Sequence, residues 1–557
     1  MTDKATVLVL GATGLFGGLL VQRLCREGRF TVVCAGRTRQ TLQALRDQTG
    51  AEYRQFDRDD PDVVQTVLIG LKPFAVIDCA GPFQEYGKDC YRFARQVVEL
   101  GCHYLDIADA TDFVSEISDL DELAKDRCVS AISGASSTPA ISSAVVDSLT
   151  KDLVEVNSVE SAIIPGNRAK RTLSVMRAVL GQVGQPYEIV RFGKNEQVRG
   201  WSELRKIDLQ TKGKPLVKGR LASMVNTPDV SLFPERYDAQ TVTFRAGLEL
   251  KIFHHALSFG RVLVATGILK SLAPLSSFAR WVASWFESFG SNVGGMKVSV
   301  LGKDDRGAML RREWDLIASD GKGPEIPTLP ISILLKKLAD GDVKPGARPS
   351  PGEVDLKEVE QALSEIDAES TLHETRVLPI FQQVLGDAFE AMPEAIRSLH
   401  NGFGQRKFGG RARTQGSLGV IGWIAAKVVG FPAAATDISV DVTITADEHT
   451  ENWQRAFGGK TFNSVMSIDE GGFLQESFGP LSMRLGLRFE NGKLHYPAIK
   501  GQLFGWIPIP TLLLPKSLAH EGVDEEGRFT FDVLLKPPFG GRIAHYKGWL
   551  IRRGSSV

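Results

Sequence analysis

The chain lacks a net charge and a long apolar run. Its 557 residues include 66 Lys and Arg against 66 Asp and Glu, so no global field attracts nucleic acid or an anionic membrane. In the most apolar window, residues 253–286, the longest uncharged stretch is nine residues, whereas a membrane-spanning helix needs about 20. The N-terminus reaches Asp3 and Lys4 and then enters a predicted strand, which argues against a signal peptide. We therefore expect a cytoplasmic protein with no transmembrane segment and no nucleic-acid partner.

Cysteine is absent after residue 128, and several catalytic motifs are absent throughout. No two of the six cysteines are spaced as CxxC, which argues against zinc and thioredoxin-type sites. We expect buried, reduced thiols, as in cytosolic proteins. There is no GxSxG, HExxH or phosphate-loop motif, and the nine histidines include no pair at i and i+4. We therefore expect no metal site.

Apolar strands alternate with helices over residues 5–135. Strands such as 6–10 and 74–81 show no polar alternation, and helices ending at Gly28 and Gly50 separate such strands. Strands of this kind are typical of a parallel sheet covered on both faces. The predicted fold class is α/β, with a Rossmann-type doubly wound parallel sheet in a first domain, residues 1–135.

The rest of the chain predicts two further domains. Residues 136–365 mix strands and helices, including a hairpin across 296–319, so we expect an α+β domain. Residues 372–557 begin with an amphipathic helical stretch and continue in strands of period two, in which Asn491-Gly492 predicts a type I′ turn. We expect a C-terminal, mostly antiparallel β domain.

Three glycines after the first strand predict a dinucleotide site. They form the pattern GxxGxxG between strand 6–10 and the next helix. Gly11 permits the tight turn, Gly14 lets the backbone approach a pyrophosphate, and Gly17 lets the helix pack on the strand. The helix N-terminus offers N–H groups to the phosphates. The residues predicted to bind the nucleotide here are Gly11, Ala12, Thr13, Gly14, Leu15, Phe16 and Gly17.

The residue after the second strand indicates which nucleotide binds. An NAD site places Asp or Glu about 20 residues after the turn, on the ribose 2′-hydroxyl. Arg37 stands 20 residues after Gly17, and a guanidinium can bind a 2′-phosphate bidentately. This predicts NADP(H), the alternative being a surface arginine in a loop. Asp57 could meet the adenine or be a solvated loop carboxylate. The segment expected beside the nicotinamide ribose is Cys79, Ala80, Gly81 and Pro82.

Polar side chains follow two later strands, at the sheet edge where doubly wound folds bind ligands. In HYLDIAD (103–109), a tyrosine and carboxylates could donate and accept protons beside the nicotinamide. In the second segment, 133–143, hydroxyls before Pro139 could bind substrate or cap the next helix. Alternatively, the first group only packs at a strand end and the second is only a cap. The predicted catalytic residues are Tyr104, Asp106 and Asp109, and the predicted substrate residues are Ser136, Ser137 and Thr138.

Residues 163–220 hold thirteen Lys and Arg against four Asp and Glu. Such a run is usually a solvated face. It could instead attract an acidic substrate or carrier.

Several segments together resemble the saccharopine dehydrogenase-like NADP-binding family. They are GATGLFGG (11–18), AGR (35–37), VIDCAGPFQEYG (76–87), GCHYLDIAD (101–109) and SGASSTPA (133–140). The resemblance covers roughly residues 5–365, and the C-terminal part resembles a domain of unknown function often fused behind such proteins in bacteria. Where many relatives carry a glutamate, this chain has Ala108-Asp109. The resemblance implies that the second domain serves dimerisation and substrate binding, which would make a homodimer.

Members of that family include saccharopine reductases and an enoyl reductase of lipid and polyketide assembly. The resemblance therefore implies an NADP(H)-dependent oxidoreductase that reduces a C=N, C=O or activated C=C bond of a small molecule, apolar or carrier-bound in some members. The alternative is a non-catalytic nucleotide-binding protein whose C-terminal β domain holds a ligand, since antiparallel sheets can enclose apolar cavities. Residues 504–515 would then line that cavity.

Overall fold

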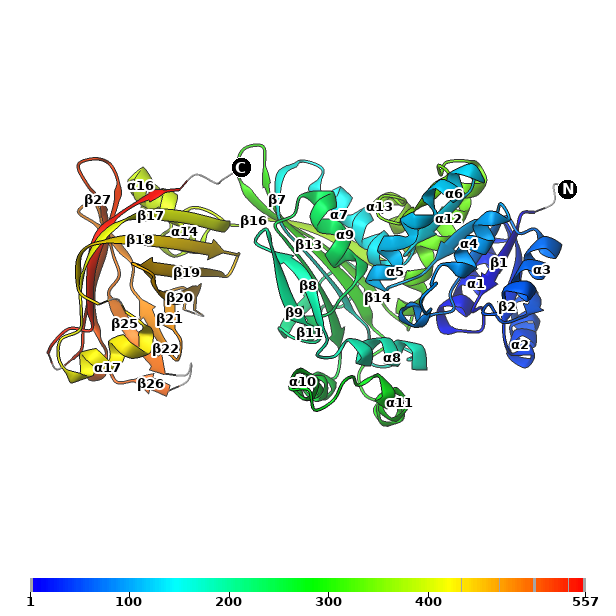
Figure 1. The fold of residues 1–557 in the computed structure, drawn as a ribbon, viewed down its shortest axis with the longest axis horizontal. Helices are drawn as coiled ribbons and strands as arrows, with labels where there is room; N and C mark the ends of the chain where they lie inside the picture. Colours follow the sequence, from blue (N-terminus) through cyan, green and yellow to red (C-terminus); the bar gives the residue numbers. More distant parts are fainter. Residues whose placement is uncertain (1–3, 432, 470, 504–506, 539, 554–557) are drawn as a thin grey trace. The chain divides into compact units, whose positions relative to one another are not determined.

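The apolar N-terminal strands form one parallel sheet, in the order β15-β6-β5-β4-β1-β2-β3 (Figure 1). The computed structural model, which describes residues 4–431, 433–469, 471–503, 507–538 and 540–553, confirms the predicted α/β fold. Every residue of β4 and β6 is buried, which explains the lack of polar alternation. The strands are β1 (Thr6–Leu10), β2 (Thr31–Gly36), β3 (Glu52–Gln55), β4 (Ala75–Asp78), β5 (His103–Asp106), β6 (Ser130–Ser133) and β15 (Gly346–Pro349).

Helices between these strands cover the sheet. α1 ends at Gly28 and α2 at Gly50, both in the left-handed conformation that favours glycine at a helix end. The helices are α1 (Leu15–Glu27), α2 (Arg39–Thr49), α3 (Pro61–Leu71), α4 (Arg92–Glu99), α5 (Thr111–Ser115), α6 (Asp121–Asp126), α7 (Ser142–Thr150), α12 (Leu329–Asp340) and α13 (Leu356–Ser364). Shorter turns are η1 (Phe83–Glu85), η2 (Glu116–Leu120), η3 (Ser137–Ile141) and η5 (Gly323–Thr328).

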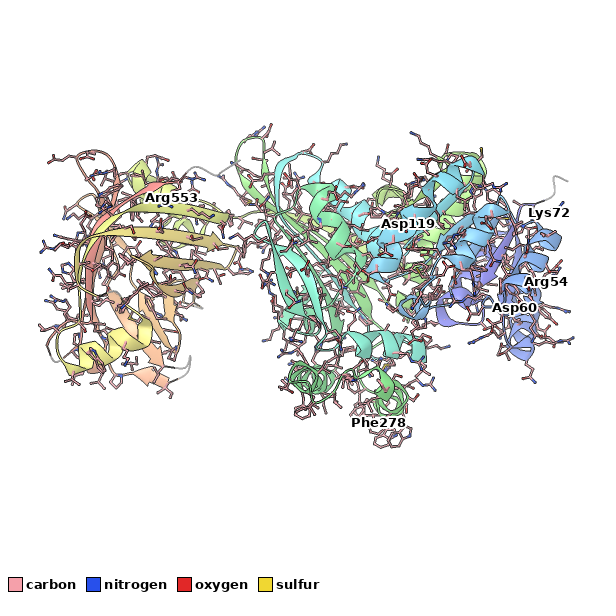
Figure 2. All side chains as sticks on the ribbon, in the orientation of Figure 1. Arg54, Asp60, Lys72, Asp119, Phe278 and Arg553 are labelled. Carbon is pink, nitrogen blue, oxygen red and sulfur yellow. The ribbon has the colours of Figure 1, made fainter. Side chains whose placement is uncertain are left out.

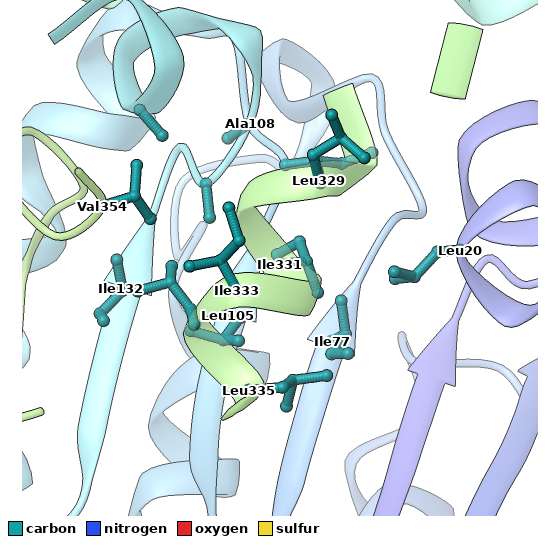
Figure 3. Close-up of a cluster of buried hydrophobic side chains, with 14 of the residues drawn as sticks. Leu20, Ile77, Leu105, Ala108, Ile132, Leu329, Ile331, Ile333, Leu335 and Val354 are labelled. Carbon is teal, nitrogen blue, oxygen red and sulfur yellow. The ribbon is translucent and has the colours of Figure 1, made fainter. Parts of the chain in front are cut away.

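A late segment of the chain completes this first layer. α12 places apolar side chains such as Ile331 and Leu335 among those of β4 and β5, including Ile77 and Leu105 (Figure 3). β15 pairs with β6, so the sheet takes its outer strand from residues 346–349. The first sheet and its core therefore include elements from beyond residue 135, and the division at residue 135 stays a prediction. Met1–Thr375 form one compact unit, and Arg376–Val557 form a second.

The second sheet of the first unit has the order β10-β11-β12-β7-β13-β14-β16. β13 and β14 form the hairpin predicted across 296–319, and β7 pairs with β12 in parallel. The strands are β7 (Leu153–Ile164), β10 (Arg205–Leu209), β11 (Val217–Met224), β12 (Thr241–Leu248), β13 (Gly294–Asp304), β14 (Met309–Ala318) and β16 (Ala368–Arg376), beside the separate hairpin β8 (Pro186–Arg191) and β9 (Lys194–Arg199). The helices are α8 (Leu173–Gln182), α9 (Pro228–Tyr237), α10 (Lys251–Ala265), η4 (Ala273–Leu275) and α11 (Ser276–Ser284).

The second unit is a large antiparallel sheet, as predicted. Its strand order is β23-β24-β27-β28-β29-β17-β18-β19-β20-β21-β22-β25-β26. Asn491 and Gly492 both have positive φ, of 52° and 72°, which confirms the type I′ turn between β23 and β24. The strands are β17 (Gly404–Gln415), β18 (Ala435–Ala446), β19 (Thr450–Phe457), β20 (Lys460–Ile468), β21 (Leu474–Phe478), β22 (Leu481–Leu485), β23 (Arg488–Glu490), β24 (Lys493–His495), β25 (Ala498–Leu503), β26 (Ile507–Ile509), β27 (Lys516–Val523), β28 (Phe529–Lys536) and β29 (Ala544–Arg552). The helices are α14 (Ile380–Leu385), α15 (Asp387–Glu390), α16 (Glu394–His400), α17 (Val420–Val429) and η6 (Thr511–Leu513).

The six cysteines differ in how deeply they are buried. All six cysteines are unpaired, but only Cys34 and Cys102 are buried, and Cys128 is exposed. Cys128 lies in the turn between α6 and β6, which the apolar pattern of its neighbours did not reveal.

Across the described part of the chain, no helix combines the length and the apolar character that crossing a membrane requires.

Candidate functional site

Two glycines after β1 hold the turn at the edge of the first sheet. Gly11 has a φ of +68°, and a Cβ there would lie 2.7 Å from the carbonyl carbon of Cys79, at the end of β4. A Cβ on Gly17 would lie 2.3 Å from the carbonyl oxygen of Gly11. Both distances are shorter than real Cβ contacts, so a larger side chain would force the turn, α1 and β4 apart. The predicted tight turn and close helix packing are therefore both present.

The N-terminus of α1 is open. Its N-cap residue, Gly14, is exposed and supplies no side-chain hydrogen bond, and the first turn contains no acidic residue. The first N–H groups of any helix have no partner inside the helix, and they carry the positive end of its dipole. Leu15 and Phe16 are only half-buried here. A Cβ on Gly14 would lie 3.1 Å from the carbonyl oxygen of Gly11, and without a side chain the exposed backbone of this turn could approach a pyrophosphate.

The end of β2 presents a free guanidinium. Arg37 is exposed, and within the described residues its side chain has no ion-pair or hydrogen-bond partner, while its carbonyl accepts a bond from Gln55 Nε2 at 2.9 Å. Thr13 and Gly36 lie close together, which brings the β2 end beside the glycine turn. Asp57 is exposed, and its Oδ1 accepts a bond from the Asp59 N–H at 3.1 Å, within its own loop.

Two buried carboxyl groups lie at the ends of adjacent strands. Asp78 ends β4 and Asp106 ends β5, and the two are direct partners in the sheet. The Oδ1 of Asp106 accepts three bonds, from the Ala108 N–H, the Gly134 N–H and the Ser133 hydroxyl, at 2.9, 2.7 and 3.0 Å. Its Oδ2 is buried and has no hydrogen-bond partner within the described residues. Burial raises the pKa of Asp106 to about 7 and raises that of Asp78 above its ordinary value.

Asp78 belongs to a cluster that the sequence did not reveal. Its Oδ2 accepts a bond from the Tyr86 hydroxyl at 3.0 Å and lies 3.6 Å from Arg58 Nη1. The Arg58 guanidinium lies 3.4 Å from the centre of the Tyr86 ring, a close cation–π contact. Burial, followed by the charge of Asp78, raises the pKa of Tyr86. The available signal was a single carboxylate ending the otherwise apolar strand AVID, just before Gly81-Pro82.

The predicted catalytic residues do not share one environment. Tyr104 is only 1% exposed and its ring packs edge-on against Phe93, so burial raises the pKa of its hydroxyl. Asp106 is buried beneath the strand ends, as described above. Asp109 is exposed, and its Oδ1 accepts a bond from Gln84 Nε2 at 3.3 Å, which ties it to the segment that carries Tyr86.

The predicted substrate residues follow β6. Ser136, Ser137 and Thr138 are all buried, in and just before η3. Ser136 occupies the N-cap position but makes no side-chain capping bond, which corrects the prediction of a serine cap. The reason lies at Gly134, whose positive φ and tight packing against Pro139 turn the backbone away from a regular helix start.

Five of the thirteen basic residues in the run at 163–220 form ion pairs within the protein. Arg177, Arg191, Arg205, Lys214 and Arg220 form ion pairs with nearby carboxylates. One of these pairs, Arg177 with Glu85 at 3.3 Å, joins α8 to the segment that carries Tyr86. Among the described residues, no group of three His, Cys, Asp or Glu side chains is arranged to hold a metal ion.

Comparison with known proteins yields one family and several folds. Residues 392–550 match a family described as Domain of unknown function (DUF4166), and no curated protein sequence matches the chain. Apo histidine-tagged saccharopine dehydrogenase (L-Glu forming) from Saccharomyces cerevisiae is 15% identical, with a TM-score of 0.50 over 67% of this chain and 100% of that one. GenD2 from gentamicin A biosynthesis, in complex with NAD, is 11% identical, with a TM-score of 0.33 over 66% and 93%. Myo-inositol dehydrogenase from Corynebacterium glutamicum is 10% identical, with a TM-score of 0.25 over 44% and 68%.

The first of these likenesses concerns the fold. At 15% identity, it shows that a part of the chain about as long as the first unit has the architecture of saccharopine dehydrogenase. This confirms the fold that the sequence motifs predicted. The chain thus joins a saccharopine dehydrogenase-like fold to a C-terminal part that matches the DUF4166 family over residues 392–550.

Proposed function

We propose that this chain is an NADP(H)-dependent oxidoreductase that reduces a C=N, C=O or activated C=C bond of a small molecule. The observation that carries the proposal is the open N-terminus of α1, which starts at the strand edge where Asp78 and Asp106 end β4 and β5. A doubly wound sheet binds nucleotides where its strand order reverses, which here lies beside β1 and β4. An open helix N-terminus and two protonatable carboxyl groups thus lie at one sheet edge, which supports the proposal.

The cofactor is expected to lie across this edge. The turn at 11–17 would receive the pyrophosphate at the N–H groups that α1 leaves free. Arg37 would bind the 2′-phosphate, since its guanidinium has no partner within the described residues. The half-buried segment Cys79–Pro82 would lie beside the nicotinamide ribose. When bound, NADP(H) supplies or accepts a hydride.

The substrate is expected beside the exposed polar groups of the same edge. Tyr86 is half-buried and Asp109 is exposed, so both could touch a bound molecule, whereas Asp78 and Asp106 would act as positioning residues. Asp78 orients the Tyr86 hydroxyl, and Asp106 holds the β6 turn that carries Ser136–Thr138. Tyr104 has no direct part here, because its side chain is buried in the core.

Replacing Arg37 by alanine is expected to weaken NADPH binding about 10- to 100-fold and to leave NADH binding unchanged. The reason is that a charge-assisted, bidentate contact to a phosphate contributes about 1.5–3 kcal/mol, and NADH has no 2′-phosphate. Calorimetric titration of the purified chain with each nucleotide measures both affinities. Arg54→Ala is the matched control, since Arg54 is an exposed arginine on the neighbouring strand β3 and forms an ion pair with Glu52.

A chain that binds neither nucleotide would contradict the proposed function outright. Equal binding of NADH and NADPH by the parent chain would contradict the role of Arg37. If nucleotide binds, a screen of imines, ketones and activated alkenes for NADPH oxidation tests the reaction. A chain that binds NADPH tightly and turns over none of these classes would favour the non-catalytic alternative.

An observation in the second unit favours a ligand-binding role for its sheet. A cavity lies in this unit, and part of it is open to solvent. Its wall is mostly apolar and aromatic, which is typical of small-molecule sites. The lining includes Trp453, Phe457, Met466, Phe478, Met483 and Phe531. The described residues 507–515 are not part of this wall, which corrects the prediction that 504–515 line it, and 504–506 lie outside the described residues.

The polar groups of the cavity indicate an uncharged occupant. Arg455 Nη1 donates to the Ser464 hydroxyl at 2.7 Å, and Nη2 lies 3.3 Å from Glu476 Oε1. Both charged side chains are only 12% exposed, so they neutralise each other inside the wall. The lining also includes the carboxylate of Glu521, whose Oε2 lies 2.7 Å from His400 Nε2. Both carboxylates thus have partners in the protein, so the cavity suits an apolar molecule with one neutral hydrogen-bonding end.

Ala519→Trp is expected to fill the cavity and to weaken Nile red binding about tenfold or more, since the dye buries its apolar rings there. Ala519 lies on β27 and lines the cavity. Fluorescence titration of the full chain measures the affinity. Ala434→Trp, at an exposed position of the same unit, is the control, because dye bound elsewhere affects both variants equally. Equal binding by the two variants would contradict a ligand role for this cavity.

A further inference from the structure

The helices α10 and α11 expose large apolar side chains. α11 and the residue after it present Phe278, Trp281 and Trp285, which are 60, 53 and 59% exposed. Their spacing of three and four residues places them on one face of the helix. On α10, Ile252, Phe259 and Val262 form a similar exposed stripe, opposite the buried His254, Gly260 and Val264. Single exposed apolar residues are ordinary, but grouped ones mark a contact surface.

The exposed aromatic rings contact one another. Trp281 lies 5.8 Å from Phe278 and 4.3 Å from Trp285, measured between ring centres. Figure 2 shows the rings of this helix, with Phe278 labelled, extending away from the second sheet of the first unit. Together with Phe289, which is also exposed, these residues are named here the aromatic platform: Phe259, Phe278, Trp281, Trp285 and Phe289.

The root of the platform is fixed to the rest of the unit. Glu249 accepts bonds from the N–H groups of Asn167 and Ser291, at 2.7 and 2.9 Å, and pairs with Arg220 at 2.9 Å. Asn167 Nδ2 in turn donates to the carbonyl of Phe289. Hydrogen bonds and an ion pair therefore fix the backbone next to the exposed rings to the rest of the first unit.

The charges around the platform are mostly basic. Residues 251–289 contain Lys251, Arg261, Lys270 and Arg280 but only one acidic residue, Glu287. The loop at 165–172 adds exposed Arg168 and Lys170, and Arg168 Nη2 donates to the carbonyl of Ser288 at 3.0 Å. A chain with no net charge thus concentrates basic side chains beside a group of exposed aromatic residues.

We propose that the aromatic platform docks this protein on an anionic lipid surface. Tryptophan and phenylalanine enter the boundary between head groups and acyl chains, and flanking lysine and arginine attract acidic head groups. The protein would lie on the membrane, since no helix among its described residues can span one. A second copy of the chain is disfavoured as the occupant, because a symmetric contact of this face would bring its basic residues against each other.

The test is flotation of the full chain with lipid vesicles. The parent chain is expected to float with vesicles of phosphatidylcholine and phosphatidylglycerol and much less with phosphatidylcholine alone. The triple variant Phe278→Ser/Trp281→Ser/Trp285→Ser is expected to lose about tenfold or more of its bound fraction, since membrane binding follows buried apolar area. Phe473→Ser, which removes an exposed phenylalanine of the second unit, is the matched control and is expected to float like the parent.

A second pair of variants tests the charge requirement separately from folding. Lys170→Gln/Lys251→Gln, at two exposed lysines, leaves every exposed ring and the bond from Arg168 to Ser288 in place, and is expected to reduce binding several-fold, with the deficit disappearing at high salt. A parent chain that stays unbound to both vesicle types would overturn the proposal. So would a lipid-free dimer, measured by light scattering, that the triple variant converts to monomer, because the platform would then be a self-association surface. Binding that is equal on both vesicle types would refute the anionic requirement.

Discussion

Glu451→Gln is expected to lower the free energy of unfolding of the second unit by about 3–5 kcal/mol, the usual cost of removing one partner from a buried ion pair. Glu451 on β19 and Arg406 on β17 are 1% and 4% exposed at their side chains, with 3.4 Å between Arg406 Nη2 and Glu451 Oε1. Glu451 Oε2 also accepts a bond from Trp453 Nε1 at 3.0 Å. Burial raises the pKa of Glu451, whereas the charge of Arg406 opposes that rise. Glutamine keeps the shape of the site but leaves the Arg406 charge buried without a counter-charge.

Hydrogen exchange of peptides from β17 and β19, measured on the full chain, reports this loss without assuming that both units unfold together. Asp437→Asn is the matched control, because it breaks the ion pair of Asp437 with Arg411, also on β17 but exposed. It is expected to leave protection nearly unchanged. Replacing both Glu451 and Arg406 by apolar residues is expected to recover part of the loss. A Glu451→Gln variant as well protected as the parent would contradict the argument.

The parts of the fold that local chemistry specifies could be predicted from the sequence. Gly11 and Gly17 are required by a positive φ and a close backbone approach, and both requirements act within a few residues of each glycine. Asn491-Gly492 marked its turn because few other residue pairs tolerate two positive φ angles in succession. The apolar strands indicated a covered parallel sheet because burial on both faces removes polar alternation.

The parts that depend on distant contacts could not be predicted. Residues 346–349 lie in a stretch rich in turn residues, and only pairing with β6 makes them a strand. Tyr104 and Tyr86 both lie close to apolar residues in the sequence. The Tyr104 ring is buried in the core, however, whereas the Tyr86 ring faces Arg58. The direction of each side chain depends on the register of the sheet and on the path of residues 83–86. Residue type alone determines neither of them.

The free energy of unfolding of the first unit is expected to depend on pH because Asp106 ionises. Its folded pKa of about 7 lies above its ordinary value of 3.8, so between these pH values the folded chain holds a proton that the unfolded chain has released. The free energy of unfolding of the first unit therefore falls as the pH rises through this window, by up to about 4 kcal/mol at about 1.4 kcal/mol per unit. Asp106→Asn, which cannot ionise, is expected to match the parent near the lower limit and to be the more stable at pH values above the upper one. Thermal melts of the full chain across this range measure the difference.

The variant Asp229→Asn is the control that distinguishes the effect of ionisation on stability from a role of Asp106 in turnover. It is as buried as Asp106, its pKa is also raised to about 7 by burial, and its Oδ1 accepts a bond from the Ser142 hydroxyl at 3.0 Å. Asp229→Asn is therefore expected to change the pH dependence of stability in the same direction. Only Asp106→Asn is expected to shift the pH profile of NADPH oxidation, with NADPH affinity unchanged, because in the parent a carboxyl group that ionises in this range holds the turn that carries Ser136–Thr138. If both variants lost turnover equally, the effect would be one of general stability, and Asp106 would have no particular part in the reaction.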